Sequence, residues 1–115
     1  MTYVSGFVIP VKTADRDAYL ECARTAAPIF KEFGAVSVVE NWGDNLPDGK
    51  VTDFKMAVKA EADETVVFSW IVWPDKTTSD AAEKRMMDDP RFKDMPMPFD
   101  GKRMIFGGFE TLFEG

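Results

Sequence analysis

The fold is decided by a stretch in the middle of the chain, Thr65-Val66-Val67-Phe68-Ser69-Trp70-Ile71-Val72-Trp73-Pro74. Apolar residues fall on both of its alternating faces, and the run stops at a proline. Because a strand with one face in water would alternate apolar with polar residues, this pattern predicts a central strand covered on both sides. Trp70 and Trp73 are three residues apart and therefore point to opposite faces. Which of them faces a pocket stays open at this point.

The segments before this stretch predict two strands and two helices. Residues 2–11 and 35–42 have the composition of strands. Between them an apolar stripe, which includes Tyr19 and Phe30, recurs every three or four residues and predicts a helix that is capped by Thr13 and ends at Gly34. Pro28 is expected to kink this helix or to start a new turn. A second, short helix over residues 53–59, capped by Thr52, is expected after a loop rich in turn-forming residues.

The segments after it predict a helix, a loop and a last strand. Thr77 and Asp80 have the spacing of a capping box at a helix start, and this helix should end before Pro90. Residues 91–100 contain two prolines and predict a stiff loop. Residues 102–113 predict the final strand.

Reduced to its main elements, this order is βαββαβ within one α+β domain spanning residues 1–115. It predicts a ferredoxin-like fold with an antiparallel sheet and both helices on one face. The other face of the sheet also carries large apolar side chains, and a surface of that kind usually marks an interface. We therefore expect a homodimer in which two sheets pack face to face.

Composition excludes several kinds of function. The net charge is −6 and no stretch concentrates Lys or Arg, so neither nucleic acid nor an acidic membrane surface is expected as a partner. The chain contains no histidine, the usual metal ligand and general base, and we expect no metal and no cofactor. Cys22 is the only cysteine, and no apolar run resembles a signal peptide or a membrane span. These features predict a cytoplasmic protein.

Three aromatic or amide side chains are candidates for binding a ligand. Asn41 and Trp42 end the second strand, where an amide could orient a carbonyl group and an indole could stack on a ring. Trp70 could line the same pocket if it faces the helices. The alternative is that the tryptophans pack in the core and Asn41 bonds within its own turn.

Glu40, Arg103 and Tyr3 are the remaining candidates. A buried carboxylate such as Glu40 could have a raised pKa and serve as a base in place of histidine. The alternative is a solvated rim, in which Arg103 pairs with a carboxylate and Tyr3 bonds locally.

The sulfur-containing residues are expected to serve packing. Cys22 lies on the apolar stripe of the first long helix, and Met86 and Met87 are expected to fill the core. The methionines together with Phe92 and Phe99 could instead form an adaptable apolar site.

Three stretches together resemble the YbaA-like family of small bacterial proteins of unknown function. They are residues 1–8, residues 40–54 and residues 63–70. The resemblance implies a dimeric α/β-barrel, in which two ferredoxin-like sheets close around each other. The wider superfamily includes cofactor-free monooxygenases, haem-degrading enzymes and isomerases, so the fold does not specify an activity.

The function predicted from these observations is binding of a small, partly apolar molecule in a cleft between sheet and helices. One alternative is a cofactor-independent monooxygenase or isomerase acting on an aromatic or carbonyl compound. Another is a non-catalytic interaction module that uses the cleft or the loop over residues 94–99.

Overall fold

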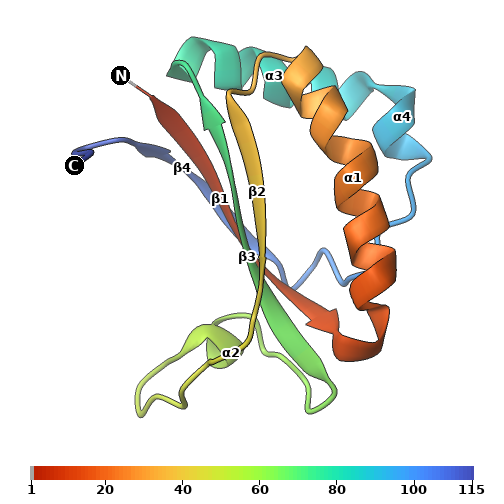
Figure 1. The fold of residues 1–115 in the computed structure, drawn as a ribbon, viewed down its shortest axis with the longest axis vertical. Coiled ribbons are helices and arrows are strands. Elements are labelled where there is room, and N and C mark those ends of the chain that lie inside the picture. Colours follow the sequence, from red (N-terminus) through yellow and green to blue (C-terminus); the bar gives the residue numbers. More distant parts are fainter. Residues whose placement is uncertain (1) are drawn as a thin grey trace.

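The computed structural model describes residues 2–115 and confirms the ferredoxin-like α+β fold. Within these residues, four strands form one antiparallel sheet in the order β2-β3-β1-β4. The helices α1 and α3 lie together on one side of this sheet (Figure 1). The strands are β1 (Tyr3–Lys12), β2 (Ser37–Trp42), β3 (Glu64–Trp73) and β4 (Ile105–Glu110); the helices are η1 (Thr13–Asp15, a 3-10 helix), α1 (Arg16–Glu32), α2 (Phe54–Ala57), α3 (Lys76–Asp88) and α4 (Pro90–Lys93).

The two faces of β3 belong to different surroundings, as its sequence predicts. Trp73 is 1% exposed and packs in the core with Ile29 of α1, with Phe33 directly after α1, and with Ala82 of α3. Trp70 lies on the opposite face, where its ring is 5.3 Å from that of Phe68. Trp73 therefore faces the helices, and Trp70 faces away from them.

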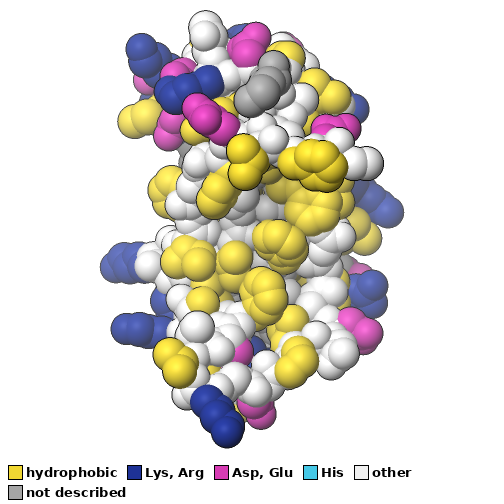
Figure 2. Space-filling model, turned by 90° about the vertical axis from the view of Figure 1, so that its left-hand side faces the viewer, with side chains coloured by type: hydrophobic (Ala, Val, Ile, Leu, Met, Phe, Trp, Pro, Cys, Tyr) yellow, Lys and Arg dark blue, Asp and Glu magenta, His cyan; other side chains and the backbone are white. Residues whose placement is uncertain are grey.

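The sheet face that points away from α1 and α3, called the outer face below, is only partly covered. The short helix α2 lies at one end of it, where the ring of Phe54 is 6.0 Å from that of Phe68. Phe68 nevertheless remains 46% exposed, and Phe109 on β4 remains 58% exposed. Figure 2 shows hydrophobic side chains gathered over the middle of this face. This surface matches the apolar second face expected from the sequence.

The long helix α1 is continuous through Pro28, which neither breaks it nor starts a new turn. The helix is preceded by the turn η1, and no side chain caps it, so the expected cap at Thr13 is wrong. Its end is as expected, since Gly34 follows it with φ of 108°, a left-handed conformation that favours glycine.

Two predicted caps are also wrong by one or two residues. Asp53 rather than Thr52 caps α2, and Asp75 rather than Thr77 caps α3. Each aspartate has an extended backbone, and its carboxylate accepts a hydrogen bond of 2.7 Å from the backbone N–H three residues on. That geometry defines an N-cap, and its position depends on the residue at which the preceding strand or loop ends.

The C-terminal region departs from prediction in three places. The segment expected to be a loop over residues 91–100 begins with the helical turn α4. The last strand covers only Ile105–Glu110, because residues 101–103 form a turn. Met87 is 73% exposed, so it does not fill the core as expected. Among residues 2–115, no helix combines the length and the apolar character that crossing a membrane would take.

Candidate functional site

A cavity of about 390 Å³ lies between the helix-facing side of the sheet and the helices α1 and α3. The segment from Phe92 to Phe99 forms part of its wall, so three parts of the chain that are distant in sequence meet here. Its apolar lining includes aromatic rings from β1, α1 and α4, and the ring of Phe30 is 5.2 Å from that of Phe92. The volume and the apolar walls are those of a small-molecule pocket.

Methionine makes up an unusual share of this lining. Five of the seven methionines of the chain border the cavity. They are Met86, Met87, Met95, Met97 and Met104. Because methionine side chains are unbranched and polarizable, such a wall can adapt to ligands of different shape.

A carboxylate and a phenol are paired on the wall of this apolar cavity. Glu40 lies on β2 directly opposite Ser69 of β3, on the sheet face that points to the helices. The hydroxyl of Tyr19 on α1 donates a hydrogen bond of 2.6 Å to Oε1 of Glu40. Glu40 keeps an exposed surface, so this pair stands where the cavity meets solvent.

Burial changes the acidity of the groups around this pair. It raises the pKa of Glu40, and the hydrogen bond from Tyr19, together with the nearby hydroxyl of Ser69, offsets part of that rise. Burial, together with the nearby charge of Glu40, strongly raises the pKa of Tyr19 and also raises that of Cys22. The phenol therefore stays protonated and remains a donor, while the carboxylate is the proton acceptor of the cavity.

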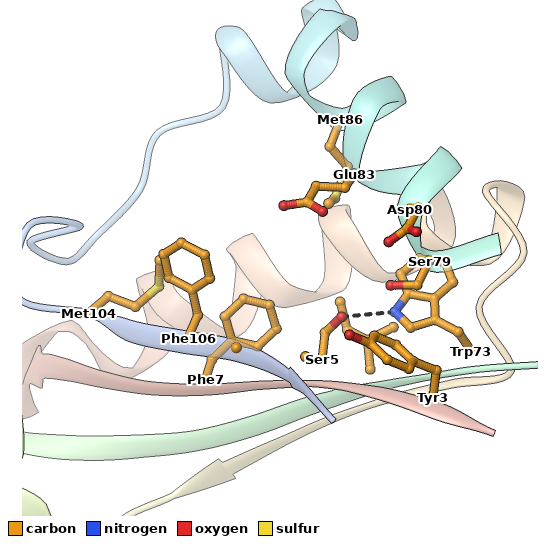
Figure 3. Close-up of a pocket in the computed structure, with 13 residues that line it drawn as sticks. Tyr3, Ser5, Phe7, Trp73, Ser79, Asp80, Glu83, Met86, Met104 and Phe106 are labelled. Carbon is orange, nitrogen blue, oxygen red and sulfur yellow. Dashed lines mark hydrogen bonds between the residues drawn. The ribbon is translucent and has the colours of Figure 1, made fainter. Parts of the chain in front are cut away.

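A second cavity of about 250 Å³ adjoins the first and shares part of its lining, including Phe7 and Met86 (Figure 3). One end of it is formed by Tyr3, Ser5 and Trp73, and side chains of α3 project towards these residues. The indole Nε1 of Trp73 donates a hydrogen bond of 3.0 Å to Oγ of Ser5. Tyr3, a candidate from the sequence, therefore lines a hollow beside the main cavity.

Asn41 and Trp42 border a smaller hollow of about 150 Å³, which also touches Glu40 and Tyr19. The guanidinium carbon of Arg16 lies 5.9 Å from the centre of the Trp42 ring, a cation–π contact. The amide nitrogen of Asn41 donates a hydrogen bond of 2.9 Å to the backbone carbonyl of Phe68. Trp42 thus lies beside the carboxylate, whereas the Asn41 amide is engaged with the sheet backbone.

The structure does not bring Trp70 or Arg103 into these cavities. Trp70 points to the outer face, because its position in β3 alternates with the inward-facing Ser69 and Ile71. Arg103 forms two hydrogen bonds with the carboxylate of Glu64, at 2.7 and 2.8 Å. This pair corresponds to the alternative reading of Arg103 as an ion-pair partner.

Sequence reasoning singled out Glu40 but not its partner Tyr19, which it assigned to an apolar stripe. The sequence signal for Glu40 was its place in the alternation of residues along the strand. Val38, Glu40 and Trp42 alternate along β2 and share one face, so a carboxylate stands between two core residues. The alternative in which the methionines form an adaptable apolar site with Phe92 and Phe99 agrees with the lining of the main cavity. The sequence could not show which methionines meet, because Met95 and Met97 lie in a segment without regular structure.

Residues 2–115 contain no group of three or more His, Cys, Asp or Glu side chains placed to hold a metal ion. The polar chemistry of the main cavity therefore rests on Glu40, Tyr19, Ser69, Cys22 and Glu83.

Comparison with solved structures supports the fold. A dimeric ferredoxin-like protein from an uncultured marine organism aligns with a TM-score of 0.63 and 12% identity over 100% of both chains. A proposed antibiotic biosynthesis monooxygenase from Bacillus cereus aligns with a TM-score of 0.57 and 12% identity, over 100% of this chain and 95% of that one. At this level of identity the similarity shows the fold alone.

Comparison of sequences identifies the family. The uncharacterized protein YbaA of Escherichia coli strain K12 is 60% identical over 116 residues, which cover 99% of each chain. The model of a family described as "Protein of unknown function (DUF1428)" matches residues 2–101. Both findings confirm the resemblance drawn from the sequence, and the chain belongs to the DUF1428 family of proteins of unknown function.

Proposed function

We propose that this protein binds a small, largely apolar molecule that carries one hydrogen-bond-donating group, such as an amine or a hydroxyl. The observation that carries the proposal is a single hydrogen-bonded carboxylate, Glu40, on the wall of a methionine-rich cavity of about 390 Å³. The apolar part of the ligand would contact the methionines and Phe30. The donor group would bind the carboxylate oxygen that Tyr19 leaves free.

The charges around the cavity support a neutral or cationic head group. Among the described residues that line it, the charged ones are Glu40 and Glu83, and both are acidic. A ligand with a carboxylate would meet repulsion from both groups in a setting of low dielectric constant. Tyr3 and Trp42 border the adjoining hollows and could extend the contact surface for a larger ligand.

The test compares three naphthalene probes that share one ring system. We expect calorimetric titration to give tightest binding for 2-naphthylmethylamine, weaker binding for 2-naphthylmethanol and at least about tenfold weaker binding for 2-naphthoate. The substitution Glu40→Gln should remove the preference for the amine, since it removes the charge and keeps the shape. Glu61→Gln is the matched control, because Glu61 is exposed and does not line the cavity. Equal binding of the amine and the carboxylate by the wild type would contradict the proposal.

A second candidate function is proton abstraction in the same cavity. The raised pKa of Glu40 favours it, because a base is most effective when its pKa lies near the working pH. The fold neighbour named as a monooxygenase adds the precedent of chemistry on this fold. With 2-indanone as a probe, deuterium exchange next to the carbonyl, followed by proton NMR, should be accelerated by the wild type and not by Glu40→Gln. Equal rates for both proteins would leave binding as the function.

We further propose that the protein is a homodimer joined through the outer face. Support comes from the exposed aromatic rings of this face, which include Phe68 and Phe109, and from a fold neighbour described as dimeric. Light scattering should give the mass of two chains for the wild type and of one chain for Phe109→Asp. Leu20→Asp, the same kind of change on the helical side, should leave the dimer intact. A monomeric wild type would refute this assignment.

A cytoplasmic location and the lack of a nucleic-acid partner stay predictions from charge and cysteine content.

A further inference from the structure

Three sulfur atoms converge at the edge of the main cavity. Sγ of Cys22 on α1 lies 3.8 Å from Sδ of Met95 and 3.9 Å from Sδ of Met97. The two methionines are 73 and 75 residues away in sequence, so the tertiary fold creates this contact. Pro96 and Pro98 alternate with them and restrict the backbone of this segment.

The two separations from Cys22 match the sulfur–sulfur spacing of a three-coordinate site. Metal–sulfur bonds of about 2.3 Å, the length of a zinc–thiolate bond, put the sulfurs of a planar trigonal site roughly 4 Å apart. Both sulfur–sulfur distances to Cys22 are close to this value. Sγ of Cys22 therefore lies at coordination spacing from each thioether, and rotation of the flexible methionine side chains would bring both thioethers to one ion at Cys22.

The donor set selects the kind of metal. Thiolate and thioether sulfurs are soft ligands and favour Cu(I) over hard cations such as Mg²⁺ or Ca²⁺. The thiolate carries a single negative charge and the two thioethers carry none. These three ligands together therefore balance the charge of a monovalent cation.

The surroundings allow a cation to reach these atoms. A hollow of about 280 Å³ borders Cys22 and Met95, and its charged lining consists of Glu21, Asp94 and Arg91. The positive charge of Arg91 is engaged, because its Nη2 lies 2.8 Å from Glu32 and 2.7 Å from Asp89. The charge of Arg91 is therefore largely neutralised and does not repel a cation that approaches the sulfur atoms.

We propose that Cys22, Met95 and Met97 form a binding site for a soft monovalent cation, Cu(I) or Ag(I). On binding, the thiol of Cys22 releases its proton to solvent, and the resulting thiolate and the two thioethers form bonds to the metal. No electron is transferred, so the site requires the metal already in its reduced form. This site goes beyond the proposed binding of an apolar molecule and does not depend on it.

The test separates metal coordination from simple packing. Packing requires only apolar side chains of suitable volume, so Met95→Leu and Met97→Leu preserve it while removing a donor. We expect anaerobic titration with Cu(I), in competition with bathocuproine disulfonate, to give one bound ion per chain. Each leucine variant should lower the affinity at least about tenfold, since even outer-shell changes cost about 10- to 100-fold in metal affinity. Cys22→Ser should abolish binding at the same competitor concentration.

Met56→Leu is the matched control, because Met56 lies on α2 and does not border the sulfur cluster. It should bind Cu(I) as the wild type does. Near-ultraviolet circular dichroism of every variant checks that the fold is intact, and native mass spectrometry with Ag(I) gives an independent stoichiometry.

Two results would overturn the proposal. One is unchanged Cu(I) affinity in the double variant with Met95→Leu and Met97→Leu, which would leave a lone thiol as the binder. The other is an affinity too weak to compete with the chelator in the wild type. Failure here is distinguishable from failure of the proposed function, because Glu40→Gln should alter naphthalene binding and keep the metal stoichiometry at one.

Discussion

The two tryptophans of β3 provide a matched test of how the strand is covered. Trp73 is 1% exposed among residues of α1 and α3, and its Nε1 donates to Oγ of Ser5 at 3.0 Å. Trp70 lies three residues away in the same strand, on the outer face. The substitutions Trp73→Phe and Trp70→Phe therefore make the same chemical change in two different surroundings.

The expected costs differ because the contacts differ. Trp73→Phe removes a hydrogen bond worth about 1 kcal/mol. The part-buried hydroxyl of Ser5 thereby loses its indole partner. The smaller ring also leaves a gap in a packed core, which adds about 1 to 2 kcal/mol. The total is about 2 to 3 kcal/mol. Trp70→Phe keeps an aromatic ring beside Phe68, so we expect a cost of less than about 1 kcal/mol in the monomer.

Urea unfolding at two protein concentrations measures both effects. With a slope of about 2 kcal/mol per molar urea, Trp73→Phe should lower the midpoint by about 1 M at either concentration. Trp70→Phe should show its effect mainly at the higher concentration, where the proposed association through the outer face would contribute to stability. If Trp70→Phe were the more destabilising change in dilute solution, the assignment of the two faces would be refuted.

Two further predictions concern single contacts. Gly108→Ala should destabilise the fold by about 1 to 3 kcal/mol in thermal unfolding, because a Cβ there would collide with the ring and hydroxyl of Tyr3. Gly101 has open space around it, so Gly101→Ala is the control and should leave the stability nearly unchanged. Arg103→Met should destabilise the protein at pH 7, because Arg103 holds the pKa of Glu64 at about 2, well below the ordinary 4.5. A lowered carboxylate pKa stabilises the folded state above pH 4.5. The difference in free energy of unfolding between wild type and variant, measured in urea, should therefore shrink as the pH falls from 4.5 towards 2. A difference that stays constant over that range would contradict this cause.

The arrangement of strands and helices was predictable because it depends on alternation and periodicity. The apolar residues on both faces of β3 indicated a central strand, and that strand lies between β1 and β2 in the sheet. The helix ends were less predictable, since Thr52 and Asp53 are both good caps and only the backbone angle selects one of them. Pro28 illustrates the same limit, because tertiary packing of α1 maintains a helix through a residue that disfavours it.

The candidate site was predictable only in part, because it joins segments that are distant in sequence. Parity along β2 placed Glu40 on a definite face, but the identity of its partner depends on how α1 lies across the sheet. The sulfur cluster depends on the path of an irregular segment, for which sequence patterns contain no period. Trp70 and Trp73 are distinguished only by the position of the helices, whose side chains pack against Trp73.

Two glutamates of this protein show how a structural carboxylate differs from one suited to a site. Glu64 is buried, bonds a guanidinium with both oxygens, and has a lowered pKa, so its charge stabilises the fold. Glu40 bonds a neutral phenol, and partial burial raises its pKa, so its charge lowers stability as the pH rises above 4.5, by an amount that its solvent-exposed surface reduces. Position 40 lies between Val38 and Trp42 on an inward face, where an apolar residue would pack without that cost. A carboxylate that opposes stability at such a position suits a ligand-binding or proton-accepting site, and this supports the site proposed around Glu40 rather than one around Glu64.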